Sequence, residues 1–184
     1  MIPSRSASRT DPVADGDALQ RVASGEVGAL GAVYDRHARA LLDFAARAAG
    51  RADAEDIVHT VFVRAARLAG VYDHRFPSAR SWLYGIASKV IQERRRSFVR
   101  TVRALMRSRL GDSHECSQVF DDRADLQRGL AKLTEAKRVV LLLADLEGFT
   151  CDEVAAMLGI PVGTVWTRLH HARRELRAFY RKVG

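Results

Sequence analysis

The sequence predicts an all-α protein built as two small helical domains joined by a flexible linker. From Ala18 onward apolar residues recur every three or four positions, the period of an amphipathic helix, and no segment alternates as a half-buried strand does. Residues 109–122 (RLGDSHECSQVFDD) interrupt this pattern with turn formers and acidic charge. The 184 residues, 47% of them hydrophobic, are enough for one or two small cores.

The first domain is expected to span residues 16–108. Residues 1–15 are polar, carry two prolines and lack periodicity, so they are predicted to be a disordered tail. Three apolar stripes then follow, from Leu30 to Ala48, from Ile57 to Leu68 and from Leu83 to Ile91. Each stripe covers several turns and therefore predicts a helix with one buried face.

The second domain, residues 123–184, is predicted to end in a helix-turn-helix. A short helix from Cys151 to Leu158, capped by Thr150 with Glu153 three residues on, precedes a Gly-Ile-Pro turn and a last helix from about Pro161 to Tyr180. Apolar residues keep to one face of that last helix. Its other sides carry hydroxyl, indole, imidazole and guanidinium groups, namely Thr164, Trp166, Thr167, Arg168, His170, His171, Arg173 and Arg174. Such a surface suits the major groove of DNA; the alternative is a helical hairpin with a merely solvated face.

The charge distribution indicates a polyanionic partner. The net charge is +8 and the pI is about 10.2. Two basic segments, +7 over residues 89–109 and +5 over residues 154–184, flank a segment of −5 over residues 110–153. Each basic segment alone is also compatible with a solvated helix face.

The first basic segment is preceded by a mixture of aromatic and basic side chains. A predicted loop from Val71 to Arg80 and the helix after it hold Tyr72, His74, Arg75, Phe76, Arg80, Trp82, Tyr84, Arg94, Arg95 and Arg96. Single-stranded nucleic acid is held by base stacking, worth roughly 1–3 kcal/mol per base, together with phosphate neutralisation. Alternatively, Phe76 and Trp82 are core residues of a small bundle.

Several protein classes are excluded. Two cysteines, Cys116 and Cys151, are too few for a disulfide scaffold or the usual zinc modules, and His114 with Cys116 does not complete a metal site. No apolar run reaches the roughly 18 residues of a membrane span, and the first residues lack a signal-peptide core. Because no nucleotide-binding motif or nucleophile–base arrangement occurs, we expect a cytoplasmic non-enzyme without cofactor, metal or membrane partner.

Two stretches resemble a known family. Residues 30–97, with YDRHARALLDFA, DAEDIVHTVFVRA and SWLYGIASKVIQERRR, are similar to region 2 of the extracytoplasmic-function (group IV) sigma-70 family. Residues 126–180, with GIPVGTVWTRLHHARRELR after an apolar helix, are similar to region 4. The resemblance implies a sigma factor that binds the β and β′ subunits of core RNA polymerase, recognises the −35 and −10 promoter elements and helps to melt the DNA. It also implies an anti-sigma factor as a partner.

The resemblance also assigns three sets of residues. Polymerase binding falls to Asp53, Glu55, Asp56, His59 and Phe62. Contacts to single-stranded −10 DNA fall to His74, Arg75, Phe76, Arg80, Trp82, Lys89, Glu93, Arg94, Arg95 and Arg96. Contacts to duplex −35 DNA fall to Thr164, Trp166, Thr167, His170, His171, Arg173 and Arg174. The three carboxylates of the first set suit a basic partner, although capping charges or a weak metal site are alternatives.

This chain departs from the family pattern at several positions. Lys89 stands where Asn is common, Trp166 where Lys or Arg is usual, and His171 where Arg is common. Without guanidinium groups at the last two positions, bidentate pairing with guanine is lost there, so we expect an altered −35 preference with Trp166 against a thymine methyl or a sugar. Two other functions remain open: a dimeric DNA-binding regulator that uses residues 126–184 alone, and a decoy that binds an anti-sigma protein.

Overall fold

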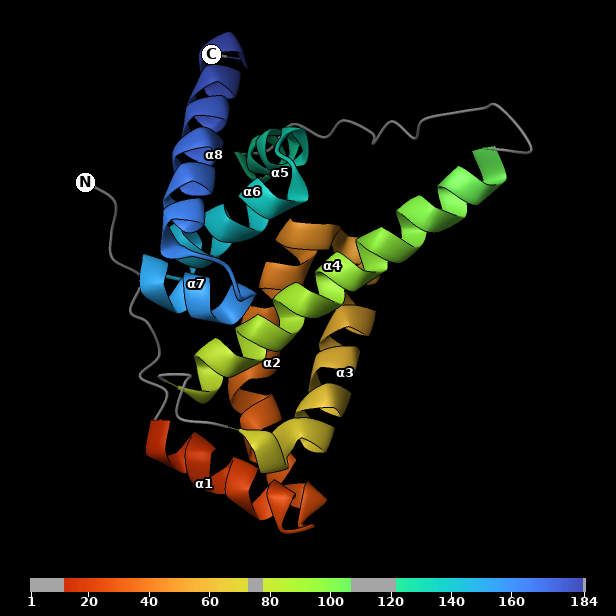
Figure 1. Ribbon diagram of the computed structural model, residues 1–184, viewed down its shortest axis with the longest axis vertical. Coiled ribbons are helices and arrows are strands. Elements are labelled where there is room, and N and C mark those ends of the chain that lie inside the picture. Colours follow the sequence, from red (N-terminus) through yellow and green to blue (C-terminus); the bar gives the residue numbers. More distant parts are fainter. Residues whose placement is uncertain (1–11, 73–77, 107–121, 184) are drawn as a thin grey trace.

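The computed structural model describes residues 12–72, 78–106 and 122–183, and within them all regular structure is helical, as predicted (Figure 1). The N-terminal half contains α1 (Pro12–Ala23), α2 (Leu30–Ala49), α3 (Arg51–Leu68) and α4 (Ala79–Met106). The C-terminal half contains α5 (Asp122–Lys132), α6 (Glu135–Leu141), α7 (Cys151–Leu158) and α8 (Val162–Val183). Short turns of 3₁₀-helix follow α1 and α3, and a π-helical turn, η3 (Leu142–Leu146), follows α6.

The three predicted stripes form the core of the N-terminal half. Helices α2, α3 and α4 pack against one another, and α1 lies across one end of them (Figure 1). Phe44, Ile57 and Leu83, one from each stripe, are fully buried. Gly50 has a φ of 108°, a conformation that disfavours a side chain and lets the chain reverse directly from α2 into α3.

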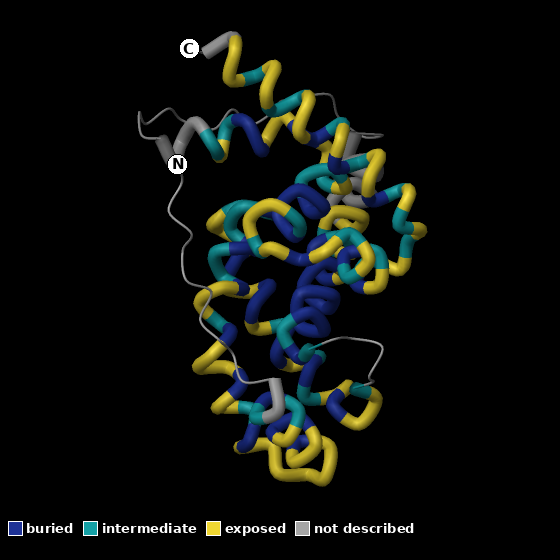
Figure 2. Tube along the Cα trace, turned by 90° about the vertical axis from the view of Figure 1, so that its left-hand side faces the viewer, coloured by how far each residue is buried: buried dark blue, intermediate teal, exposed yellow. Residues whose placement is uncertain are grey.

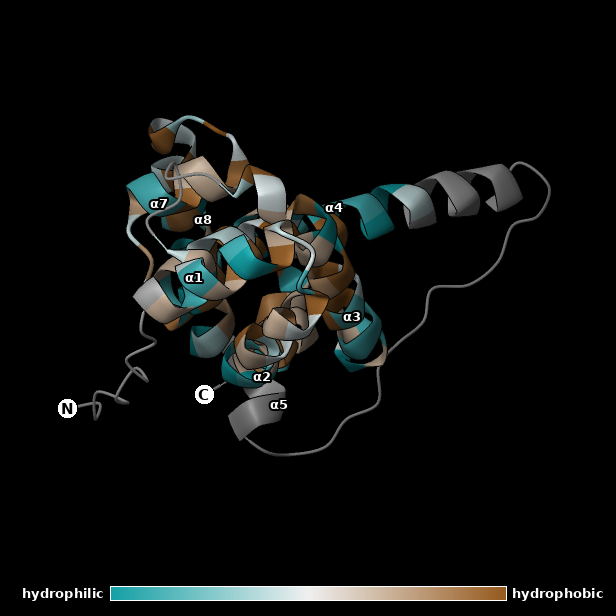
Figure 3. Cartoon of the chain, turned by 90° about the horizontal axis from the view of Figure 1, so that it is seen from below, coloured by the Kyte–Doolittle hydropathy of each residue, from teal (hydrophilic) through white to brown (hydrophobic). Residues whose placement is uncertain are grey.

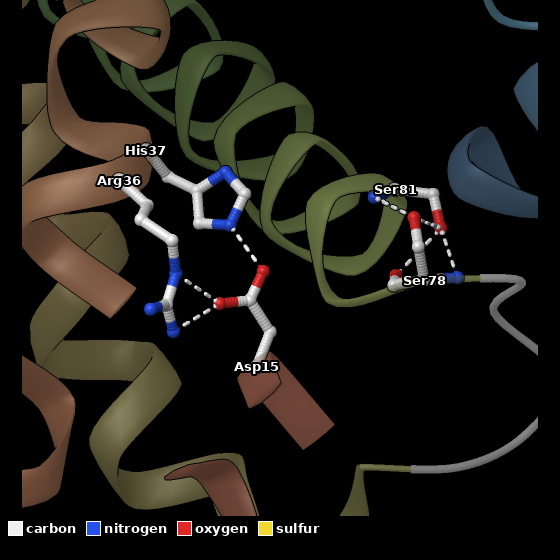
Figure 4. Close-up of polar contacts among 5 residues, drawn as sticks. All are labelled: Asp15, Arg36, His37, Ser78 and Ser81. Atoms are coloured by element: carbon white, nitrogen blue, oxygen red, sulfur yellow. Dashed lines mark hydrogen bonds and ion pairs between the residues drawn. The ribbon is translucent and has the colours of Figure 1, made fainter. Parts of the chain in front are cut away.

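The folded chain begins earlier than the sequence predicts. Helix α1 starts at Pro12, inside the range 1–15 that was expected to be a tail, and Asp15 is only 1% exposed. Its carboxylate accepts from Arg36 Nε at 2.6 Å and lies 2.7 Å from His37 Nε2 (Figure 4). Because these partners lie on α2, the local sequence gave no signal of the burial. Residues 1–11 lie outside the described residues.

The first helix of the helix-turn-helix has the predicted boundaries, and the second is longer than predicted. Thr150 Oγ1 accepts from the Glu153 amide, and the Glu153 carboxylate accepts from the Thr150 amide at 2.8 Å, which is the predicted capping box. Gly159, at a φ of 63°, ends α7 in the left-handed conformation. Helix α8 begins at Val162 and continues to Val183, three residues beyond the prediction.

The two halves share one continuous core. A single cluster of buried apolar residues extends from α1 to α8, and buried residues follow the interior of both halves (Figure 2). Tyr84 of α4 packs between Phe44 and Phe149, at ring-centroid distances of 5.1 and 5.2 Å. Arg138 NH1 donates to the carbonyl of Ala48 at the end of α2, 2.9 Å away. The predicted linker 109–122 lies outside the described residues apart from Asp122, which begins α5.

Candidate nucleic-acid interface

Helix α8 presents a polar and cationic surface opposite its packed face. Val165, Leu169 and Ala172 are buried against the C-terminal half, whereas Trp166 is 61% exposed. Of the other residues predicted to contact −35 DNA, Thr167, His170, Arg173 and Arg174 are exposed, and Thr164 and His171 are partly exposed. The sequence therefore predicted correctly which side of this helix is open.

The cationic surface is longer than predicted. A shallow groove beside α8 is lined by Trp166, Arg173 and Arg174 and continues along Arg177 and Arg181. The last two residues were not predicted, although they follow Arg174 at intervals of three and four and so lie on the same face. These guanidinium groups extend the cationic surface toward the end of α8.

Arg173 is held by a carboxylate from outside α8. Its Nε and NH2 donate to Asp145 of η3, at 3.0 and 2.6 Å. These hydrogen bonds raise the pKa of Arg173 and fix the guanidinium plane. Since a guanidinium has five N–H donors, NH1 and the second hydrogen of NH2 are left for another partner. Asp145 was not predicted, because the pair is 28 residues apart in the sequence.

The residues predicted to bind −10 DNA lie in several environments. His74, Arg75 and Phe76 lie outside the described residues. Trp82 is 5% exposed and packs edge-on against Tyr72, with 5.2 Å between the ring centroids. It is therefore a core residue, which was the alternative interpretation, and its ring is not open to a base. The reason is that Tyr72, ten residues earlier in the chain, covers its ring. Arg80 is partly buried under the C-terminal half.

The predicted polar residues farther along α4 are at the surface. Lys89, Glu93, Arg95 and Arg96 are exposed, and the helix becomes hydrophilic where it leaves the bundle (Figure 3). Several form ion pairs: Glu93 with Arg64, Arg95 with Glu135, and the partly exposed Arg94 with Asp53 and Asp56. The hydrogen bond from Arg64 lowers the pKa of Glu93. The predicted −10 and polymerase-binding sets thus meet through Arg94.

Three of the five residues predicted to bind polymerase, Glu55, His59 and Phe62, line a groove between α2 and α3. Asp53, Glu55, Asp56 and His59 are exposed, and the last of these lines the groove with Glu55. Phe62 belongs to the buried stripe of α3 and lines the groove from below, with the Tyr34 ring packed over it at a centroid distance of 4.8 Å. The exposed apolar groups of this groove are instead on Val27, Tyr34 and Val63, which the sequence analysis did not single out.

Known proteins are similar to this chain in sequence. The family models for sigma-70 region 2 and sigma-70 region 4 match residues 33–101 and 123–176. The ECF RNA polymerase sigma factor SigL of Mycobacterium tuberculosis is 33% identical over 88% of this chain and 94% of its own length. A probable RNA polymerase sigma-C factor of Mycobacterium bovis is 34% identical over 68% of this chain and 69% of its own. This chain belongs to the ECF family of sigma-70 factors.

Two solved structures have a fold similar to that of this chain. CnrH in complex with the cytosolic domain of CnrY matches with a TM-score of 0.67 and 26% identity, covering 93% of this chain and 99% of that one. RpoE in complex with the anti-sigma factor NepR from Bartonella quintana shares the fold, with a TM-score of 0.66 and 23% identity over 78% and 91% of the two chains. As a sigma factor, the protein binds core RNA polymerase and promoter DNA and acts in promoter recognition and transcription initiation.

The described part of the sigma factor offers no site for a metal ion. No three His, Cys, Asp or Glu side chains gather there in a suitable arrangement, and the carboxylates of Asp53 and Asp56 lie instead against Arg94. His114 and Cys116 lie outside the described residues. Within residues 12–72, 78–106 and 122–183, none of the helices is both long and apolar enough to span a membrane.

Proposed function

We propose that this sigma factor uses three separate surfaces in initiation. The exposed side of α8 contacts duplex −35 DNA, the start of α4 and its cationic run hold separated −10 DNA, and the α2–α3 groove docks on polymerase. The observation that carries the proposal is the division of α8 into a buried apolar face and an exposed face with Trp166 and the arginines.

Recognition of −35 DNA by α8 follows from its chemistry. Trp166 offers a large apolar surface to a thymine methyl or a sugar, and the guanidinium row from Arg173 to Arg181 neutralises phosphates. Because Trp166 and His171 replace cationic residues common in the family, fewer guanines are read by bidentate pairing. The resulting preference is for an A·T-rich contact near Trp166.

The −10 strand is held mainly by charge along α4. Lys89, Arg95 and Arg96 project into solvent and suit the phosphates of a strand that follows the helix. Base capture is assigned to residues 74–76 and to Arg80. Trp82 contributes by supporting the start of α4 from inside the core.

Docking to polymerase combines apolar contact with charge. The α2–α3 groove exposes Tyr34 and Val63, and the carboxylate of Glu55 lines it, whereas Asp53 and Asp56 lie against Arg94 of α4. A basic partner helix with an apolar stripe fits such a surface, because it buries the apolar area and neutralises the rim.

The factor acts in the cytoplasm beside polymerase and has no catalytic reaction of its own. An anti-sigma protein is a further partner, since in the two similar structures RpoE is bound to the anti-sigma factor NepR and CnrH is bound to the cytosolic domain of CnrY.

Run-off transcription with core polymerase tests the proposal. The purified protein, added to core enzyme and a library of genomic fragments, is expected to co-purify with the enzyme and start RNA at specific sites. Association with core without any specific start would favour the decoy. Binding of duplex operators as a dimer, with no association with core, would favour the ordinary regulator.

A further inference from the structure

Four side chains join the C-terminal half to the start of α4. Arg80 NH2 donates to the Glu147 carboxylate at 2.8 Å and to the Glu147 carbonyl at 3.1 Å. The Tyr84 hydroxyl donates to the same carboxylate oxygen at 2.6 Å. The Arg80 guanidinium also lies over two rings, 4.3 Å from the centroid of Phe149 and 5.0 Å from that of Tyr84.

This junction is withdrawn from solvent. Tyr84 and Phe149 are buried, and the Glu147 side chain is 12% exposed. Burial and the neighbouring Glu147 carboxylate raise the pKa of the Tyr84 hydroxyl, which therefore remains a hydrogen-bond donor. Residues 147 and 149 lie between η3 and α7, so one short connection supplies both the anion and the ring that cover α4.

The two α4 residues have the chemistry of a nucleotide site. A guanidinium and a hydroxyl together bind one oxyanion, and a guanidinium stacked beside an aromatic face binds a planar ring. A nucleotide of single-stranded DNA presents both groups, a phosphodiester and a base, next to each other. Glu147 and Phe149 likewise present an anionic group and a planar ring next to each other: the carboxylate accepts from Arg80, and the phenyl ring lies under the Arg80 guanidinium.

We propose that Arg80 and Tyr84 form a binding site for one nucleotide of single-stranded DNA, and that Glu147 and Phe149 occupy this site as substitutes for the phosphate and the base. The proposal deepens the function proposed above and rests on it. It follows that the strand and the C-terminal half compete for α4. The protein then binds single strands weakly, because only the fraction of molecules in which Glu147 and Phe149 have left the site can bind a strand.

Titration of the full-length protein with a fluorescein-labelled dT12 strand, followed by anisotropy, tests this competition. The variant Glu147→Gln/Phe149→Leu weakens the cover without changing α4. It is expected to bind dT12 about tenfold more tightly than the wild type, since a larger fraction of molecules is open. Adding Tyr84→Phe to this variant keeps the ring and removes the hydroxyl. The affinity for dT12 is then expected to fall about threefold relative to the double variant, because one hydrogen bond to phosphate is lost.

Glu175→Gln is the matched control for charge. It also removes one carboxylate from the C-terminal half, but Glu175 pairs with Lys137 of the same half. It is expected to leave the dT12 affinity unchanged. If the cover variant binds no more tightly than this control, or if Tyr84→Phe has no effect within the cover variant, the proposal is overturned.

A second measurement uses the wild type alone. Saturating dT12 is expected to increase its radius of gyration in small-angle X-ray scattering, since the strand displaces the C-terminal half; an unchanged radius contradicts competition. Circular dichroism checks folding, and Glu147→Gln alone replaces the double variant if the latter unfolds. Run-off transcription by the wild type separates the two proposals: failure there refutes the sigma-factor surfaces, whereas failure of the dT12 tests refutes only the nucleotide site.

Discussion

Replacing Trp166 with alanine tests whether α8 reads duplex DNA. The side chain is 61% exposed. A tryptophan offers up to about 250 Å², so roughly 150 Å² is available to a partner. Covering half of that area at about 25 cal/mol per Å² contributes about 2 kcal/mol. Trp166→Ala is therefore expected to weaken binding of the −35 duplex by roughly 30-fold.

Anisotropy titration at fixed ionic strength measures this loss on the −35 duplex of a promoter found in the transcription assay. Leu68→Ala, which truncates an exposed apolar residue of α3, is the control and should leave the affinity unchanged. Association of the Trp166 variant with core polymerase should also be unchanged, and its melting temperature should move by no more than about 2 °C. An affinity loss below about threefold would refute the contact. An equal loss of core association would identify Trp166 as a folding residue.

Three other substitutions test particular contacts. Asp145→Asn frees Arg173 from its carboxylate and should reduce discrimination between the −35 duplex and base-substituted duplexes by roughly threefold to tenfold in competition titrations. Asp15→Asn breaks a buried ion pair and should cost roughly 3 kcal/mol of unfolding free energy, a fall of roughly 6–12 °C in Tm by calorimetry. Replacing both Arg177 and Arg181 with glutamine should reduce the slope of log K against log salt by about 0.9 per lost phosphate contact.

Each of the three has a result that contradicts it. If D145N discriminated between the −35 duplex and base-substituted duplexes as well as the wild type does, Arg173 would not depend on its hydrogen bonds to Asp145. Asp43→Asn, at an exposed pair with Arg39, should cost about 0.5 kcal/mol or less; a loss in D15N no larger than this would refute the importance of the buried pair. Arg67→Gln on α3 removes the same charge as either α8 substitution, and an equal change in slope for that variant would show that α8 has no special role.

The sequence was sufficient for features set by neighbouring residues. The apolar periods of α2, α3 and α4, the capping box of Thr150 and the boundaries of α7 depend on contacts within three to five positions, which local patterns encode. The exposed side of α8 was predictable for the same reason, because one amphipathic helix fixes which residues point away from its core.

Side chains at the edges of an apolar stripe could not be placed in this way. Trp82 adjoins residues of a buried face, and its burial depends on whether another element covers it. Tyr72 packs against its ring. This contact leaves no periodic signal in the sequence.

Local patterns in the sequence determined the helices of this protein, their caps and the polar side of its last helix. Only the tertiary structure decided which charged groups meet, because Asp15 finds its partners on another helix and Arg80 meets Glu147 across 67 positions. Such contacts form when helices pack into one core, and that packing places the connection between η3 and α7 against the start of α4.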